Sequence, residues 1–348
     1  MLLPIEAIID FNVKSCPEFK TQDSKILSNL LPTFDPFMAN PCLIIIFNHR
    51  YDKNIPVLRK IYSPRFSHIY FLVPFYNGND ADVIPVYESS YYFQAFFAQG
   101  YNRFHRDEFT HYIFTGDDCL LNPAVNEHNF LEQTGLIAGA DFIPGFIQFH
   151  TLKDGGWWHT KKAVDFFHNR EGAEVQRELP SREEALKRFN KHGITIAPLT
   201  KENIFGTKKI SFLKWWQSWL YKQFFLRIKW KKYRKNGKIE LPYPAAGSYS
   251  DMFIITKESI TDFCRYCGIT GSIGLFVEIA IPTSLLLSSD KIVQEKDLRL
   301  QGKALWSAAE VEAVEKQFGK SLSALLNGFP AEQLYYHPVK LSKWNNDL

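Results

Sequence analysis

The prediction of the fold starts from one short stretch, His111-Tyr112-Ile113-Phe114-Thr115-Gly116-Asp117-Asp118-Cys119-Leu120-Leu121-Asn122-Pro123. Aromatic and β-branched residues run straight into Gly-Asp-Asp, a pattern that predicts a short buried strand followed by a turn. Asp117 and Asp118 would then lie at the carboxyl end of the strand, where open α/β sheets bind their ligands. Two adjacent carboxylates repel each other unless a cation lies between them, and hard divalent cations prefer oxygen ligands. The alternative is that both aspartates only cap a turn or a helix.

Two further strands, with helices between them, are predicted upstream of this stretch. Residues 42–47 are a continuous apolar run, which is typical of a buried parallel strand, and residues 68–74 are a second strand. One helical pattern begins at Asn54, and a second covers residues 91–101. Strands that alternate with helices predict an α/β fold, here a Rossmann-like mixed sheet flanked by helices. The chain contains neither GxGxxG nor GxxxxGKS/T, which argues against a dinucleotide site or a P-loop.

The composition indicates a globular protein with a large core. Of the 348 residues, 45% are hydrophobic and 22% are charged. Aromatic residues make up 16%; their faces suit sugar rings, bases and membrane interfaces, although a phenylalanine-rich core explains most of them more simply. The five cysteines are scattered and odd in number, which predicts no disulfide framework and a reducing compartment. Cys264 and Cys267 have no second pair to complete a zinc site and are interpreted as ordinary helix residues.

The amino terminus and the apolar stretches bear on the location of the protein. Residues 1–6 lack the basic region and the long apolar core of a signal peptide. The most apolar later stretch, residues 271–287, contains Glu278 and Pro282 and falls short of a membrane-spanning helix. We therefore expect a cytoplasmic protein that is either soluble or peripheral on the inner face of the membrane.

Residues 208–238 differ in composition from the rest of the chain. They contain eleven Lys and Arg residues and no Asp or Glu, with tryptophan, tyrosine and phenylalanine interleaved. A basic, aromatic, roughly helical segment predicts an interfacial helix on an anionic membrane surface. Single-stranded nucleic acid would need similar chemistry, but no nucleic-acid partner is expected. The remaining alternative is an amphipathic helix whose aromatic residues are core and whose lysines are solvated.

Two further features carry candidate site residues. Trp157 and Trp158 follow two glycines in a loop, and their flat apolar faces would suit an acceptor sugar, although a pair of core tryptophans explains them equally well. Glu278 lies in an otherwise apolar run. A buried ionised carboxylate is costly unless it is paired, so Glu278 is predicted to be either partnered or functional.

Taken together, residues 42–342 resemble a glycosyltransferase of the GT-A fold. Gly116-Asp117-Asp118 is similar to the DxD-type motif of that family, whose last carboxylate holds a divalent metal that bridges the donor diphosphate. Because Gly116 replaces the first aspartate, the ribose contact would pass to Asp117. Ala245-Ala246-Gly247-Ser248 looks like the small-residue loop that lies along the donor. Glu278 falls where the family has the carboxylate that faces the acceptor, and Tyr336-His337-Pro338-Val339-Lys340 is similar to the segment whose histidine completes the metal site.

The resemblance implies roles for individual residues. A divalent cation, Mn²⁺ or Mg²⁺, would be held by Asp118 and His337, and the histidine favours Mn²⁺. Glu278 is the first candidate for the general base that an inverting transfer needs, and Asp251 is the second. The nucleotide-sugar donor, a UDP-sugar in the first instance, would be bound by Asn48, Arg50, Asp117, Gly247 and Lys340. Trp157 and Trp158 would contact the acceptor.

The expected organisation is an extension packed on the core, residues 1–40, followed by a catalytic domain, residues 41–345. Its nucleotide-binding half would cover residues 41–125, and its acceptor half, residues 126–345, would contain the basic insertion. The expected function is transfer of a sugar to a glycan or lipid-linked glycan acceptor in polysaccharide or glycoconjugate biosynthesis. Alternatives are a non-catalytic glycan- or membrane-binding module on a degenerate transferase fold, a metal-dependent phosphoesterase and a nucleic-acid-binding protein.

Overall fold

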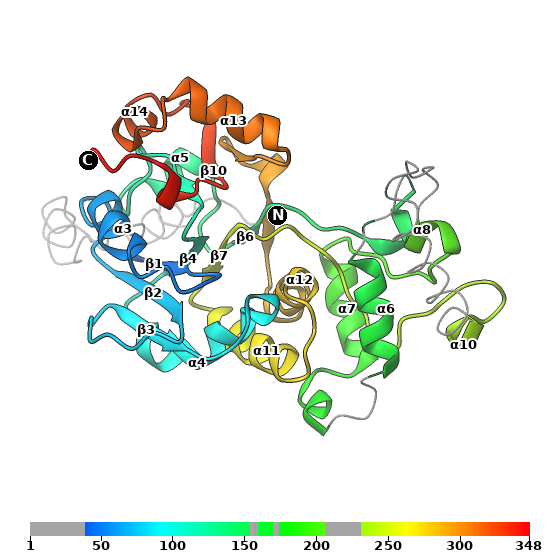
Figure 1. Cartoon of the computed structure of the whole chain (residues 1–348). Coiled ribbons are helices and arrows are strands. Elements are labelled where there is room, and N and C mark those ends of the chain that lie inside the picture. The colour runs from blue at the N-terminus through cyan, green and yellow to red at the C-terminus, as the bar shows by residue number, and fades with distance from the viewer. Residues whose placement is uncertain (1–38, 154–156, 158, 170–173, 206–230) are drawn as a thin grey trace, which may run out of the picture. The chain divides into compact units, whose positions relative to one another are not determined.

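The computed structural model describes residues 39–153, 157, 159–169, 174–205 and 231–348 (Figure 1). Residues 39–348 form one compact unit. The predicted amino-terminal extension, apart from its last two residues, lies outside the described residues. So do Trp158 and most of the basic segment, of which only residues 231–238 are described.

A seven-stranded mixed sheet with the strand order β3-β2-β1-β4-β7-β6-β8 forms the centre of this unit. β7 pairs antiparallel with both of its neighbours, and every other pair in the sheet is parallel. The strands are β1 (Pro41–Ile46), β2 (Ile69–Pro74), β3 (Val83–Val86), β4 (His111–Gly116), β6 (Asp141–Ile143), β7 (Met252–Thr256) and β8 (Ile292–Gln294). The predicted Rossmann-like mixed α/β sheet is therefore confirmed.

The strands and helices predicted from apolar runs are confirmed within a few residues. The helix expected from Asn54 is α3 (Asn54–Tyr62), whereas the one expected over residues 91–101 begins later, as α4 (Gln94–Phe104) after the short 3-10 helix η1 (Ser90–Tyr92). Strands β3, β6 and β8 were not predicted. Each has only three or four residues, and β3 contains Pro85, which is tolerated because β3 is an edge strand.

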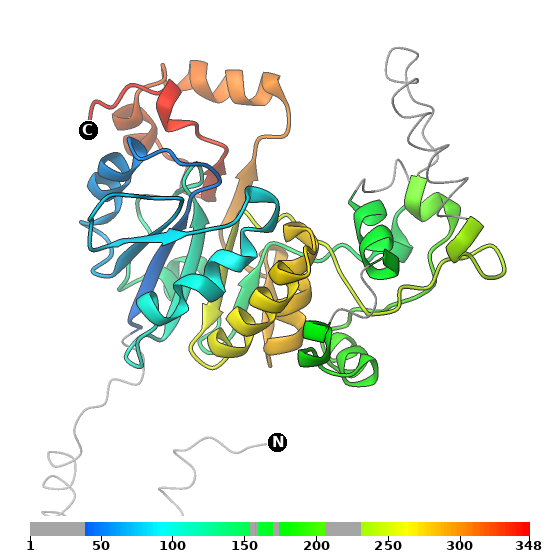
Figure 2. The same ribbon diagram turned by 60° about the horizontal axis from the view of Figure 1, so that its bottom comes forward.

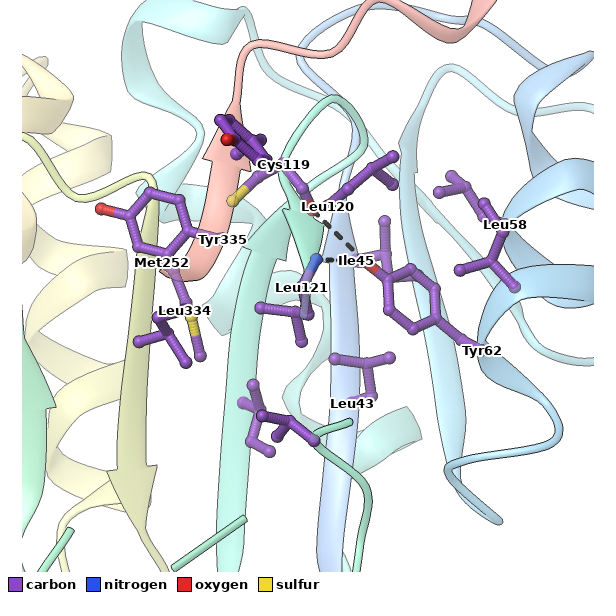
Figure 3. Packing of buried hydrophobic residues seen from close by; sticks show 14 of the residues in the cluster. Leu43, Ile45, Leu58, Tyr62, Cys119, Leu120, Leu121, Met252, Leu334 and Tyr335 are labelled. Atoms are coloured by element: carbon purple, nitrogen blue, oxygen red, sulfur yellow. Dashed lines mark hydrogen bonds between the residues drawn. The ribbon is translucent and has the colours of Figure 1, made fainter. Parts of the chain in front are cut away.

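The continuous apolar run of β1 is explained by burial of both faces of the sheet. Successive side chains of a strand point to opposite faces. Leu43 and Ile45 pack with α3, as Figure 3 shows for Leu58 and Tyr62. On the other face, the side chains of β1 pack with those of α4, α11 (Ile260–Ser272) and α12 (Val277–Ser288). Figure 2 shows these helices lying along the sheet. Cys264 and Cys267 are buried in α11, as ordinary helix residues.

A small second sheet joins distant parts of the chain. β5 (Leu120–Leu121) pairs antiparallel with β10 (Gln333–His337), which pairs parallel with β9 (Gln301–Ala304). Helices α13 (Ala308–Gln317) and α14 (Leu322–Asn327) contribute Val314, Leu322 and Leu325 to the same core cluster as β5 and β10. The pairing of β5 with β10 brings residue 337 to the turn after β4.

The remaining elements are short. They are the helices α5 (Phe130–Thr134), α6 (Thr160–Asn169), α7 (Arg182–Lys191), α8 (Lys201–Phe205) and α10 (Lys231–Tyr233), and the 3-10 helices η2 (Phe149–Thr151), η3 (Glu174–Glu178), η5 (Glu295–Asp297) and η6 (Leu341–Lys343). Residues of α6 and α8 share a core cluster with the first turn of α12. In the described part of the chain, no helix has the length and apolar character needed to cross a membrane.

Candidate functional site

A cavity of about 640 Å³ opens where β1, β4 and β10 end. Ligand sites in proteins typically measure about 300–1,000 Å³, so the cavity has the size of a small-molecule site. Five of the residues predicted for the site line it: Asn48, Asp118, Asp251, Glu278 and His337. These residues come from five separate segments of the chain.

The backbone of the Gly-Asp-Asp turn positions Asp118. The Asp117 N–H donates to the Ile46 carbonyl at 2.9 Å, which extends the β1–β4 ladder, and the Cys119 N–H donates to the Gly116 carbonyl at 3.0 Å. A Cβ atom on Gly116 would lie 3.2 Å from Asp118 Oδ1, so glycine lets the carboxylate fold back over the strand end.

Tyr62 of α3 fixes the chain just beyond this turn. Its buried hydroxyl donates to the Cys119 carbonyl at 3.3 Å and accepts from the Leu121 N–H at 3.1 Å (Figure 3). A side chain from the helix next to β1 therefore ties down both the turn and the start of β5.

The register of β5 and β10 brings His337 to Asp118. Tyr336 lies opposite Leu120 in this antiparallel pair, so the next residue of β10 reaches the turn. The Val339 N–H then donates to the Asp118 carbonyl at 2.7 Å. Two segments more than two hundred residues apart are joined at this point by backbone hydrogen bonds.

His337 lies between two carboxylates. Its Nε2 is 3.3 Å from Asp118 Oδ1, and its Nδ1 is 3.1 Å from Asp251 Oδ2. Asp251 directly precedes β7, and its carbonyl accepts a hydrogen bond from the Gly116 N–H at 3.3 Å. Burial alone would lower the pKa of His337, but the interactions with Asp118 and Asp251 outweigh it and raise the pKa to about 10.

The donor set suits a divalent cation with a small number of protein ligands. Asp118 Oδ1 is buried and has no hydrogen bond of good geometry among the described residues, so it has lone pairs available for a ligand. In the same part of the chain, no group of three or more His, Cys, Asp and Glu side chains is arranged to hold a metal ion. A cation bound by Asp118 and His337 would displace the proton on Nε2 of His337, because a histidine binds a metal only through a deprotonated ring nitrogen. Its other ligands would come from water and phosphate oxygens, as Mg²⁺ commonly does.

Glu278 lies in the first turn of α12, where the helix dipole favours a carboxylate. It is not fully buried: 27% of its side chain is exposed, and it lines the cavity. Its Oε2 is 2.9 Å from Nε2 of His159, whose side chain is only 4% exposed. The ring of His159 stacks on Phe276 at 4.4 Å. Glu278 is thus both partnered and accessible to a ligand.

Asp117 points away from the cavity. It is buried and accepts a hydrogen bond from Asn54 Nδ2 at 3.0 Å. Burial, followed by the charge of Asp118, raises the pKa of Asp117 to about 7. The predicted contact of Asp117 with the donor is therefore not supported by its position, since the side chain secures the start of α3 instead.

Two basic residues predicted to bind the donor do not line the cavity. Arg50 is exposed and pairs with Asp52 at 3.0 Å, and it also contacts Asn77. Lys340 is exposed as well. Among the polar residues that follow β1, Asn48 and His49 line the cavity.

The small-residue loop and Trp157 form core rather than a ligand surface. Ala245 and Ala246 are buried, and a Cβ atom on Gly247 would lie 2.3 Å from the Trp157 ring. Trp157 is 6% exposed, stacks on Phe149 at 5.8 Å and does not line the cavity. These positions therefore do not support the expectations that Gly247 lies along the donor and that Trp157 offers its face to an acceptor.

Several cavity residues were not predicted from the sequence. They include Tyr249 and Ser250, which directly precede Asp251, and also Tyr91, His159, Phe276 and Trp306. The position of Tyr249 and Ser250 beside a candidate carboxylate was a usable signal. Nothing in the sequence near Trp306 distinguishes it from the many aromatic residues of the core.

Comparison with known proteins gives no assignment for this site. No protein-family model matches the chain, and no curated protein is similar to it. Its function is therefore argued from its own residues.

Proposed function

We propose that the protein is a metal-dependent glycosyltransferase of the GT-A type, which transfers a sugar from a nucleotide-diphosphate donor to a glycan or lipid-linked glycan acceptor. The observation that carries the proposal is the convergence of Asp118, Asp251 and His337. They meet at the carboxyl end of a central strand and line one cavity with Glu278. Ligands of open α/β sheets bind at this edge, which supports a nucleotide donor there.

The proposed roles follow from the chemistry of each side chain. Asp118 and His337 would hold a divalent cation, which when bound supplies Lewis-acid stabilisation of the leaving diphosphate. Glu278 is positioned to accept the proton of an acceptor hydroxyl, and His159 at 2.9 Å orients its carboxylate. Asp251 is the second candidate base, although its contact with His337 suits it better to orient that imidazole.

The test is a thermal-shift panel of UDP-, GDP-, CMP- and TDP-sugars, each with and without Mn²⁺. A ligand that binds only the folded state stabilises it by about 2.7 kcal/mol at a hundredfold excess over its dissociation constant. We expect one nucleotide to raise the melting temperature in a metal-dependent way. Asp118→Ala and His337→Ala should abolish the shift, whereas Asp52→Ala, which removes an exposed carboxylate outside the cavity, should retain it.

A flat panel would overturn the proposal. It would favour a non-catalytic binding module, for which Asp118→Ala should leave function intact. A nucleotide shift of equal size without metal and in Asp118→Ala would also count against it, because the cation site would then be irrelevant to the donor.

A further inference from the structure

Trp306 combines exposure with a place in the cavity wall. It is 65% exposed, the highest value among the large hydrophobic side chains in the described part of the chain. Isolated exposed aromatics are common on protein surfaces and mean little by themselves. Trp306, however, lines the cavity that contains Asp251 and Glu278, and its ring meets that of Tyr249 at 4.5 Å.

The backbone on both sides of Trp306 and the hydroxyl of Tyr249 are fixed by hydrogen bonds. The N–H of Leu305, the residue before Trp306, donates to the His337 carbonyl at 2.6 Å. The residue after it, Ser307, begins α13 with a capping box. The Tyr249 hydroxyl accepts from Trp157 Nε1 at 2.8 Å. The pair therefore forms an apolar surface, and the backbone that carries Trp306 is tied to the strand that carries His337.

A polar group lies next to this surface. Ser250 is 8% exposed and lines the cavity, and its hydroxyl has no hydrogen-bond partner among the described residues. An unpaired buried hydroxyl is destabilising, so a ligand hydroxyl that pairs with it would recover that loss. Asp251, the next residue, adds a carboxylate acceptor.

The chemistry of the wall selects the ligand. A sugar ring has apolar C–H faces, which suit an aromatic platform, and a hydroxyl edge, which suits Ser250 and Asp251. Three carboxylates line the cavity, from Asp118, Asp251 and Glu278, and no Lys or Arg is among its described lining residues. His337, whose pKa is raised, offsets part of this charge beside Asp118 and Asp251, but the carboxylates remain in excess. An anionic sugar next to Asp251 and Glu278 would be repelled, so a neutral one fits this part of the wall best.

We propose that Trp306, Tyr249 and Ser250 form a subsite for the ring of a neutral sugar, which is the acceptor sugar if the proposed transfer is correct. Trp306 stacks on the ring, and Ser250 pairs with one of its hydroxyls. This subsite takes the role that Trp157 and Trp158 were expected to have. Binding of a neutral sugar is inferred from the wall itself, and only the identification of that sugar as the acceptor rests on the proposed function.

The test measures saccharide binding by saturation-transfer NMR and titration. The probes are the neutral trisaccharides maltotriose, cellotriose and chitotriose, with sialyllactose as the anionic probe. We expect at least one neutral probe to bind, and Trp306→Ala to weaken it by about tenfold, the size of one aromatic contact. Trp306→Phe should retain most of the affinity, and Ser250→Ala should weaken it less. Tyr87→Ala removes an equally exposed aromatic outside the cavity and should change nothing.

Three results of the saccharide titrations would overturn the subsite. They are no binding of any neutral probe, equal binding by Trp306→Ala and wild type, and preference for sialyllactose.

The nucleotide-sugar thermal shift separates this inference from the proposed function. If Trp306→Ala keeps the nucleotide shift but no saccharide binding depends on Trp306, only the subsite fails. If no protein shows a nucleotide shift while Trp306-dependent saccharide binding persists, the transferase fails and the sugar subsite stands. If Trp306→Ala loses the nucleotide shift instead, Trp306 contacts the donor and the subsite is wrong.

Discussion

The turn after β4 and the loop 245–248 have opposite surroundings. Asp118 in the turn faces a cavity and keeps a buried carboxylate oxygen that has no good hydrogen bond from any residue the structure describes. In the loop, Gly247 is packed against the Trp157 ring. Small residues in the loop therefore reflect close packing, whereas glycine in the turn makes room for a functional carboxylate. The same residue type has a different meaning in each place.

Glu278 of α12 contacts the loop through its backbone and shares the cavity of Asp118 through its side chain. Its backbone carbonyl accepts the Ser248 N–H at 2.9 Å, and its side chain reaches the cavity. A change to its side chain should therefore alter the cavity and leave the backbone contact with the loop in place. Such a variant is the sharpest test of the difference between the two regions.

The largest effect is expected from Glu278→Gln. If Glu278 is the general base, the variant should lower the turnover number by about 10²–10⁴-fold, because the amide cannot accept the acceptor proton. The donor thermal shift and the free energy of unfolding should stay nearly unchanged. The assay is release of the nucleoside diphosphate from the donor identified by thermal shift, with a saccharide acceptor present.

The control for this variant is Glu184→Gln, which alters an exposed helix carboxylate paired with Arg188. It should have wild-type turnover. Unchanged turnover in Glu278→Gln would shift the role of base to Asp251 or remove the need for a base.

A stability effect comes next, from Gly247→Val. The new side chain would meet the Trp157 ring, whose nearest atom is 2.3 Å from the position of a Cβ. Overpacking of this kind costs about 3 kcal/mol or more where neighbours cannot move. Urea unfolding measures the loss, and Gly145→Ala, whose nearest neighbour would be 3.7 Å away, is the matched control. A Gly247→Val protein of normal stability that fails to bind the donor would restore the loop as a donor contact.

The parts of the fold and of the candidate site that could be predicted from the sequence are those that depend on neighbouring residues. The apolar runs of β1 and β4 and the position of Asp118 at a strand end follow from residues adjacent in sequence. The orientation of Asp117 does not, because it depends on Asn54 sixty-three residues earlier. Likewise, the packing of Gly247 against Trp157 could not be predicted, because the two residues lie ninety positions apart. Trp306 carried no local signal, since its place in the cavity depends on the pairing of Leu305 with His337.

A moderate effect is expected from Tyr62→Phe. Loss of the hydroxyl removes the buried acceptor of the Leu121 N–H, while the Cys119 carbonyl keeps its hydrogen bond from Thr115 Oγ1, and the change should cost about 1–3 kcal/mol of unfolding free energy. Because the same hydroxyl fixes the chain after Asp118, the donor thermal shift should also shrink. Urea unfolding and the nucleotide panel measure the two effects.

Tyr112→Phe is the matched control for that change. The Tyr112 hydroxyl also bridges a backbone carbonyl and an N–H, both of Arg106, and it lies outside the cavity wall. This variant should lose stability but keep the full donor shift. If both variants reduced the donor shift equally, the turn after β4 would have no special dependence on Tyr62.

The smallest effect concerns the opposite end of β4. His111 is buried, its Nδ1 lies 3.0 Å from Thr110 Oγ1, and burial lowers its pKa to about 4. The unfolded chain binds a proton near pH 6.5, whereas the folded chain resists protonation until about pH 4. The stabilisation from a neutral His111 is therefore complete above pH 6.5 and is lost as the pH falls toward 4. Between pH 7 and pH 5.5 this amounts to about 1 kcal/mol.

Urea unfolding at both pH values should show the loss in wild type and a smaller one in His111→Gln. An equal loss in both proteins would mean that other groups cause the acid sensitivity, and that His111 is not held neutral by burial.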